Sequence, residues 1–279
     1  MRNQPHKSVS ELEELCRSLR LDILAMIRAA GSGHPGGSLS SVEILTALYF
    51  DILNIDPEEP CQIDRDRFIL SKGHIAPALY ATLAERGFFP REVLNSLRKL
   101  GSPMQGHPNM AHCAGLDCSS GSLGQGLSVA SGLALAARLR GASYRTYCLM
   151  GDGELQEGQI WEAAMSAAHY GLDNLCGIVD YNGVQLDGTT KDVMNIDPVA
   201  DKWCAFNWNV ISCDGHDLAS LLSAFESAAS CKGSPSVIIA RCVKGKGVSF
   251  MENQAAWHGQ CPNEAQYQQA IAEIEQRRL

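Results

Sequence analysis

Apolar side chains near the start of the chain recur at helical spacing. One face of the expected helix carries five of them: Leu12, Leu15, Leu19, Ile23 and Ile27. Ser10, three residues before Glu13, has the pattern of a capping box, and we expect the helix to run up to Gly31. Further helices are predicted over residues 40–53, 75–86, 90–100 and 124–140, separated by loops rich in Gly, Pro and His. The first half of the chain is therefore expected to consist of helices and loops.

The pattern changes at Tyr144, where short apolar runs begin to alternate with helical stretches. The strand-like runs are 144–150, 174–180, 207–212 and 235–243, and the helix-like ones are 156–170 and 216–231. This alternation predicts a mostly parallel sheet flanked by helices. No linker rich in Pro, Gly or Ser divides the chain, so we expect residues 1–279 to form a single α/β domain with a helical N-terminal layer. Residues 263–279 predict a terminal helix.

Composition narrows the classes of function. The 23 Lys and Arg against 31 Asp and Glu give a formal charge of -8, and no basic block occurs, which argues against nucleic acid as a partner. The 11 cysteines are scattered without a CxxC pair, so we expect a reduced, cytoplasmic compartment. The chain begins without a signal-like apolar stretch and has no run of about 18 apolar residues, so no membrane association is expected.

The stretch LMGDGELQEGQIWEAAM, residues 149–165, places Asp152 between two glycines where an apolar run gives way to a helical pattern. A second apolar run is followed by Asn182. Adjacent parallel strands would bring both side chains to one edge of the sheet, where ligands bind beside helix N-termini. A carboxylate, an amide oxygen and a backbone carbonyl suit Mg²⁺, and glycines let a diphosphate approach the backbone. Each short stretch alone would indicate only a turn, but their spacing favours a site.

GDG followed by Asn at this separation resembles the thiamine diphosphate motif, and GDGELQEG is similar to its transketolase version. Six other stretches resemble transketolase blocks in the order that the family uses: SGHPGGSLS (32–40), LSKGHIAPALY (70–80), GHPN (106–109), SSGSLGQGLSVASG (119–132), VKGKG (243–247) and WHG (257–259). The resemblance covers nearly the whole chain. It implies a thiamine diphosphate-binding fold and the transfer of a two-carbon ketol unit between sugars.

The family's functional residues can be carried onto matching positions. The resemblance implies a Mg²⁺ site made by Asp152, Asn182 and the backbone carbonyl of Val184. It implies cofactor contacts from Gly153, His74, Gly121, Ser122, Leu123, Asn182, Lys244 and His258. Glu157 matches a position near the interface through which two active sites communicate, and is grouped with the cofactor residues. Three positions depart from the family pattern: Ser122 stands where many members have proline, and Gly37 and Ile75 stand where many have alanine.

Transfer of a ketol unit between sugars requires protons to move to and from hydroxyl groups, a role that suits histidine. Imidazole titrates near neutrality and can move a hydroxyl proton or donate to an alkoxide. His34, His107 and His258 match family histidines that face the reacting hydroxyls, and His74 would join them in one cluster. The other four, His6, His112, His169 and His216, have no matched context and are interpreted as structural. A metal site made by His107, His112, Cys113 and Cys118 would fit no common zinc spacing.

In transketolases the glutamate that activates thiamine lies on a second domain, which we do not find after the WHG block. We therefore expect the N-terminal subunit of a split transketolase, with a separate C-terminal subunit that supplies the pyrimidine-binding half. A heterotetramer of two plus two chains acting on sugars or sugar phosphates is expected. Two alternatives stay open: the alpha component of a 2-oxo acid dehydrogenase, against which the histidine blocks argue, and a non-catalytic thiamine diphosphate-binding protein.

Overall fold

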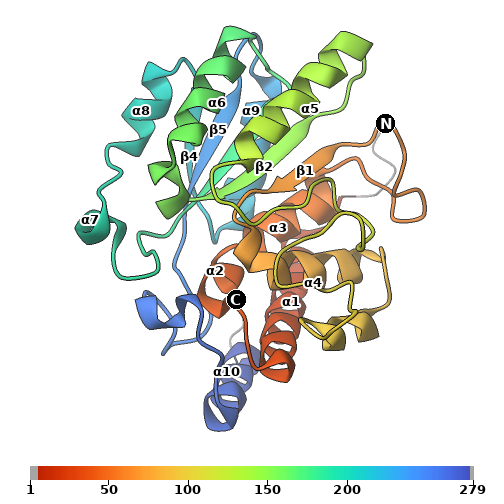
Figure 1. The fold of residues 1–279 in the computed structure, drawn as a ribbon, viewed down its shortest axis with the longest axis vertical. Helices are drawn as coiled ribbons and strands as arrows, with labels where there is room; N and C mark the ends of the chain where they lie inside the picture. Colours follow the sequence, from red (N-terminus) through yellow and green to blue (C-terminus); the bar gives the residue numbers. More distant parts are fainter. Residues whose placement is uncertain (1–5, 277–279) are drawn as a thin grey trace.

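The computed structural model describes residues 6–276 and has a central sheet with helices on both faces (Figure 1). The sheet has five strands in the order β1-β2-β3-β5-β4. They are β1 (Arg67–Leu70), β2 (Thr146–Gly151), β3 (Leu175–Tyr181), β4 (Asn209–Asp214) and β5 (Ser236–Arg241). Every neighbouring pair runs parallel. The predicted α/β class with a parallel sheet is confirmed.

The helices lie around the sheet and cover both of its faces (Figure 1). They are α1 (Val9–Ala30), α2 (Pro35–Ser40), α3 (Val42–Ala47), α4 (Ala76–Arg86), α5 (Gly126–Arg140), α6 (Gly158–His169), α7 (Thr190–Val193), α8 (Val199–Ala205), α9 (Leu218–Ser230) and α10 (Glu264–Gln276). Within residues 6–276, no helix is long and apolar enough to cross a membrane. Two hydrophobic clusters result, one involving α1, α3, α4 and α9 and the other α5, α6 and α8.

The strands serve both clusters because successive side chains point to opposite faces of a sheet. On β2, Leu149 belongs to the first cluster, whereas Met150 belongs to the second. Strands buried on both faces are continuous apolar runs, which is why the sequence pattern identified β2, β3 and β5. All strands point their carboxyl ends to one edge, and that edge is where the candidate site lies.

The first half of the chain differs from its prediction in four places. The capping box is formed by Ser8 and Glu11, slightly before the predicted Ser10 and Glu13. The predicted helix over 40–53 is instead α3 followed by a π-helical turn at Leu48–Ile52, since α2 already ends at Ser40, and 90–100 holds only a 3₁₀ helix at Arg91–Ser96. Strand β1 was not predicted at all. The predicted terminal helix is α10, and residues 277–279 lie outside the described part.

The break between α2 and α3 is explained by the hydrogen bonds of two serines. Ser41 leaves helical geometry, with φ −102° and ψ 5°, and its hydroxyl donates to the carbonyl of Gly37 at 3.2 Å. Ser40 and Ser41 both donate to Asp180 as well. Serine hydroxyls that find such partners compete with the helical backbone pattern. The break thus joins this segment to the end of β3.

Candidate functional site

A cavity of about 340 Å³ opens at the carboxyl ends of β2 and β3. Asp152 follows β2 directly and Asn182 follows β3, and the register that pairs Gly151 with Asp180 brings them to the same edge. The cavity is lined by Gly37, Lys72, His74, His107, Gly121, Leu123, Gly151, Asp152, Gly153, Glu154, Gln156, Glu157, Asn182, Val184, Gln185, Leu186, Lys244 and His258. Every one of the matched blocks therefore contributes to this cavity.

Hydrogen bonds hold the three predicted metal ligands together. Asp152 accepts from the backbone N–H of Gly153 at 2.7 Å with one oxygen and from that of Gly183 at 2.5 Å with the other. The Asn182 side-chain oxygen accepts from the N–H of Val184 at 3.1 Å. The turn at 182–184 is thereby fixed against Asp152.

The charge of Asp152 is poorly compensated. The residue is 2% exposed, and burial, followed by repulsion from Asp180, raises the pKa of its carboxyl to about 6. Asp180 is itself paired with the buried Lys72. A divalent cation would relieve the buried charge of Asp152, and carboxylate, amide and carbonyl oxygens are ligands that Mg²⁺ accepts. The residues present therefore fit such an ion.

The described part of the chain offers no second metal centre. Among residues 6–276, no three His, Cys, Asp or Glu side chains are grouped so that they could hold a metal ion. The zinc alternative at His107, His112, Cys113 and Cys118 accordingly finds no support. The Asp152 set differs in kind, since only one of its three ligands is a carboxylate.

Lys244 approaches the same place from the loop after β5. Its ammonium group donates to the carbonyl of Val184 at 2.7 Å and lies 3.0 Å from Nδ1 of His258. Burial, followed by repulsion from Lys72, lowers the pKa of Lys244 to about 8. A carbonyl oxygen has two lone pairs, so the contact with Lys244 leaves Val184 able to bind a metal ion. A buried cation beside this oxygen set suits an anionic ligand.

Four histidines lie against one another at the cavity. The ring centroids of His34 and His74 are 5.2 Å apart, those of His74 and His258 5.1 Å, and those of His34 and His258 5.5 Å. His107 is 6.5 Å from His34. Burial lowers the pKa of all four, to about 4 for His34 and about 3 for His258. The cluster is therefore neutral at pH 7 and can both donate and accept protons.

The structure does not bring every predicted residue to the cavity. Gly121 and Leu123 line it, but Ser122 between them is exposed and does not. His34 is also absent from the lining, although it packs against three lining histidines. Glu157 lines the cavity and precedes α6 as its N-terminal flanking residue. Their roles stay predictions.

The four remaining histidines lie outside the cluster. His6 contacts Asp51 at 2.7 Å, whereas His112 and His169 are exposed. His216 is bonded to Glu43 and to the backbone of Val243.

Sequence reasoning missed several residues around the cavity. Glu154 is 3% exposed and accepts from the N–H groups of Gly124 at 2.8 Å and Gly151 at 3.0 Å, and from the hydroxyl of Ser71. It thus ties together three of the loops that line the site. Lys72, Gln156, Gln185 and Leu186 were missed as well. Lys72, Glu154 and Gln156 stand inside matched blocks, which was the one available signal.

Gly37 is explained by its neighbour. A Cβ at Gly37 would lie 2.9 Å from the Cγ2 of Ile75, and 3.6 Å from Nε2 of His74. The larger Ile75 therefore needs the smaller residue opposite. These two departures from the family pattern compensate for each other beside His74.

The fold and this edge site define a thiamine diphosphate-binding α/β protein. The family described as "Transketolase, thiamine diphosphate binding domain" matches residues 10–275. The chain belongs to the transketolase family.

Relatives and solved structures agree with this assignment. An apulose-4-phosphate transketolase subunit of Phocaeicola vulgatus is 43% identical over 269 residues, which cover 96% of this chain and 95% of the relative. The 6-deoxy-6-sulfo-D-fructose transketolase subunit SqwG of Clostridium sp. is 45% identical over 265 residues, with 95% and 96% covered. The transketolase of Campylobacter jejuni superimposes with a TM-score of 0.91 at 32% identity over 96% of this chain. The chain spans only 43% of that transketolase, so it matches the length of the two subunits rather than that of the longer enzyme.

Proposed function

We propose that this chain is the diphosphate-binding subunit of a two-chain transketolase, and that residues 1–279 form a single domain of this type. Two relatives of nearly the same length are named as transketolase subunits, which supports a separate partner chain. That partner would be a C-terminal subunit carrying the pyrimidine-binding half. Pairs of each chain would assemble into a heterotetramer that works in the cytoplasm.

The observation that supports the proposal most directly is that a set of oxygen ligands for Mg²⁺ and a group of histidines line one cavity. Asp152, Asn182 and the carbonyl of Val184 would hold Mg²⁺, while neutral histidines line the same cavity. Gly153, Gly121, Leu123, His74 and Lys244 would contact the cofactor. Bound thiamine diphosphate would supply the nucleophilic carbon needed to break and form the carbon–carbon bond.

The histidines would handle the substrate's protons. Nδ1 of His258 faces the ammonium group of Lys244 at 3.0 Å and accepts from it, so the ring proton resides on Nε2. That N–H can donate to a hydroxyl or alkoxide oxygen of a sugar. Nδ1 of His34 is buried without a hydrogen-bond partner, so this ring would meet a substrate hydroxyl through its other nitrogen, Nε2. His107 would meet the incoming sugar at the entrance.

The substrate is proposed to be a sugar that carries an anionic group. One relative is named for apulose-4-phosphate and the other for 6-deoxy-6-sulfo-D-fructose. The first name contains a phosphate and the second a sulfonate, and both groups are anionic. We propose transfer of a two-carbon ketol unit from such a ketose to an aldose acceptor.

The test uses this chain co-expressed with its C-terminal partner. The complex should transfer ketol units from phosphorylated or sulfonated ketoses in the presence of thiamine diphosphate and Mg²⁺. Asp152→Asn removes the one charged metal ligand and should lower kcat/KM by about 100-fold, since even outer-shell partners of metal sites cost 10- to 100-fold. The exposed Asp201→Asn on α8 should match the parent. Decarboxylation of a 2-oxo acid without ketol transfer would refute the proposal.

A further inference from the structure

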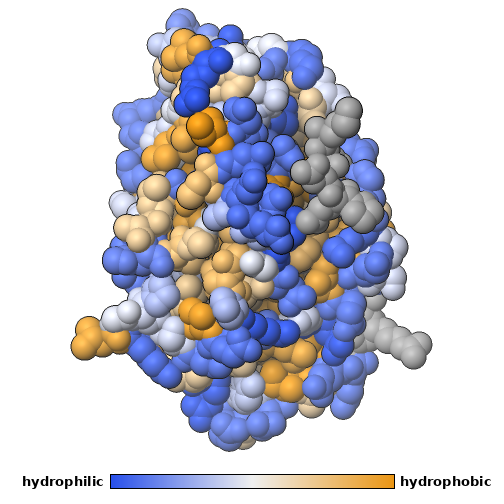
Figure 2. All heavy atoms as spheres, turned by 90° about the vertical axis from the view of Figure 1, so that its right-hand side faces the viewer, coloured by the Kyte–Doolittle hydropathy of each residue, from blue (hydrophilic) through white to orange (hydrophobic). Residues whose placement is uncertain are grey.

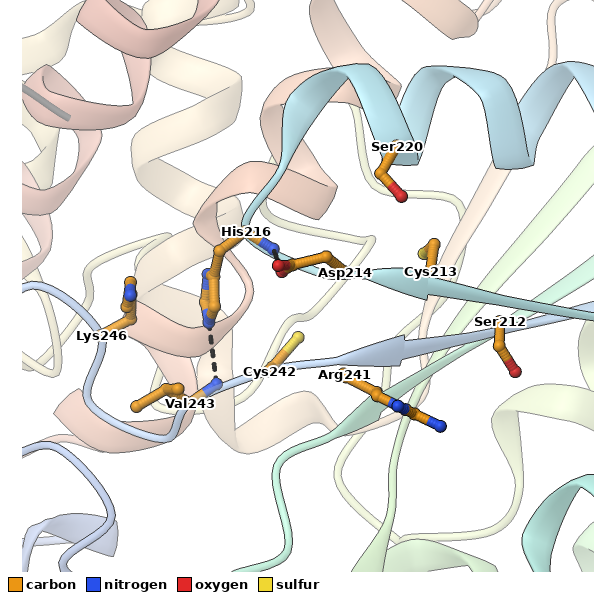
Figure 3. Close-up of a pocket in the computed structure, with 9 residues that line it drawn as sticks. All are labelled: Ser212, Cys213, Asp214, His216, Ser220, Arg241, Cys242, Val243 and Lys246. Carbon is orange, nitrogen blue, oxygen red and sulfur yellow. Dashed lines mark hydrogen bonds between the residues drawn. The ribbon is translucent and has the colours of Figure 1, made fainter.

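A second cavity, of about 630 Å³, lies at the carboxyl ends of β4 and β5 (Figure 3). His216 stands on its wall, and its ring points toward the backbone N–H of Val243. That N–H donates to Nε2 of His216 at 2.8 Å. Because a backbone N–H can only donate, Nε2 must be unprotonated and the ring proton must be on Nδ1. Nδ1 lies 3.0 Å from the Oε2 of Glu43, to which it donates.

Glu43 is held on its other oxygen by a buried arginine. The guanidinium of Arg20 donates to Oε1 of Glu43 at 2.6 Å, and the two side chains are 0% and 5% exposed. Burial raises the pKa of the Glu43 carboxyl, but Arg20 and His216 lower it by more. The net pKa is therefore below its ordinary value, and the carboxylate is ionised. The Nε of Arg20 donates to the carbonyl of Lys246 at 3.2 Å. Glu43 thus links Arg20 and His216, which are both hydrogen-bonded to the backbone of residues 243–246.

Residues 243–246 form the turn that carries Lys244. His216 holds the turn at Val243 and Arg20 holds it at Lys246, one on each side of Lys244. The turn is also fixed by the N–H of Gly245, which donates to the carbonyl of Gly36 at 2.9 Å. Gly245 has a φ of +78°, and a Cβ there would lie 2.4 Å from the carbonyl oxygen of Met251. The backbone at Lys244 therefore has little room to move.

We propose that Arg20, Glu43 and His216 form a positioning relay that sets the affinity of the site for the diphosphate of its cofactor through Lys244. The inference rests on the proposed function, in which Lys244 contacts the cofactor; its ammonium group lies beside the carbonyl of Val184 in the proposed Mg²⁺ set, which suits the anionic diphosphate. None of the three relay residues lines the cofactor cavity. Their effect passes through the backbone at Val243 and Lys246 to the ammonium group. His216, which has no matched context in the sequence, thereby acquires a role.

The experiment measures cofactor binding by the complex with the C-terminal partner. In His216→Ala, the dissociation constant of thiamine diphosphate at saturating Mg²⁺, determined by calorimetry, should rise about tenfold, as for other outer-shell positions. The kcat at saturating cofactor should stay within about twofold, because the catalytic histidines are untouched. Since the cavity beside His216 is open to solvent, added imidazole should restore much of the affinity. The exposed His169→Ala is the matched control.

A second variant keeps the test decisive even where His216→Ala fails to fold. Glu43→Gln keeps the side-chain volume but turns an N–H group toward Arg20 or His216, so it should weaken cofactor binding in the same direction. An unchanged cofactor affinity in folded variants would overturn the relay. Equal losses in affinity and kcat, without rescue by imidazole, would also overturn it, because they indicate general damage. A parent complex that binds no thiamine diphosphate would instead refute the proposed function itself.

Discussion

At the scale of single residues, the site keeps histidines neutral by burying them among cations. Burial and the charge of Arg98 lower the pKa of His34 from 6.5 to about 4. Between these values the unfolded chain binds a proton that the folded chain does not, so stability falls as the pH falls through this window. The free energy of unfolding of the parent should therefore decline more steeply between pH 6.5 and 4 than that of His34→Asn, as measured by urea denaturation.

Asp152, whose pKa is raised, is present in both proteins, so the difference between the curves reports His34 together with its effect on the neighbouring His74 and His258. The exposed His169→Asn serves as the control and should follow the parent. Parallel curves for the parent and His34→Asn would show that His34 is not desolvated in the folded protein.

Matched sequence blocks could locate Asp152, Asn182, Lys244 and His258, because their neighbours have a recognisable order. They could not reveal Glu154 as the residue that ties three loops together. A charged side chain gives no sign in the sequence of whether it is buried, and its partner Ser71 is distant along the chain. The same limit explains why the sequence could not reveal the contacts of His216 with Glu43 and Val243.

At the scale of elements, close packing of α5 against the end of β1 positions the loop 121–125. A Cβ at Gly126 would lie 2.4 Å from the Cβ of Ser71 and 2.7 Å from its Cα. Gly126→Ala should therefore destabilise the chain by about 1–3 kcal/mol, the usual cost of overpacking. Gly132→Ala on the same helix meets nothing within 4 Å and should stabilise it by about 0.5–1 kcal/mol. Denaturant titration measures both, and equal effects would contradict the packing argument.

Periodicity predicted the long elements and missed the short ones. Helices α1 and α5 and strands β2, β3 and β5 are long enough to repeat their pattern. Strand β1 has only four residues, bordered by the charged Arg65 and Asp66, so no apolar run marks it. The break between α2 and α3 depends on Asp180, which a local pattern cannot include.

At the scale of the whole molecule, apolar residues reach the surface on the face shown in Figure 2, among hydrophilic ones. Two exposed leucines line the cofactor cavity itself: Leu123 is 36% exposed and Leu186 is 61% exposed. A partner that covers the cavity would bury both and exclude water from the histidines. The proposed heterotetramer therefore predicts that this rim is part of the contact between unlike chains.

Leu186→Asp places a charge in that contact and should weaken association with the C-terminal partner by at least about tenfold, since burying an unpaired charge is costly. Light scattering of the co-expressed pair should show the mass of two plus two chains for the parent and smaller species for the variant. The melting temperature of the isolated chain should not change, because Leu186 is exposed. Leu139→Asp is the control: Leu139 is 80% exposed but lies at the opposite end of α5 from the loop that lines the cavity. If Leu139→Asp separated the chains and Leu186→Asp did not, the partner would have to dock away from the cavity, and its proposed pyrimidine-binding half could not complete this site.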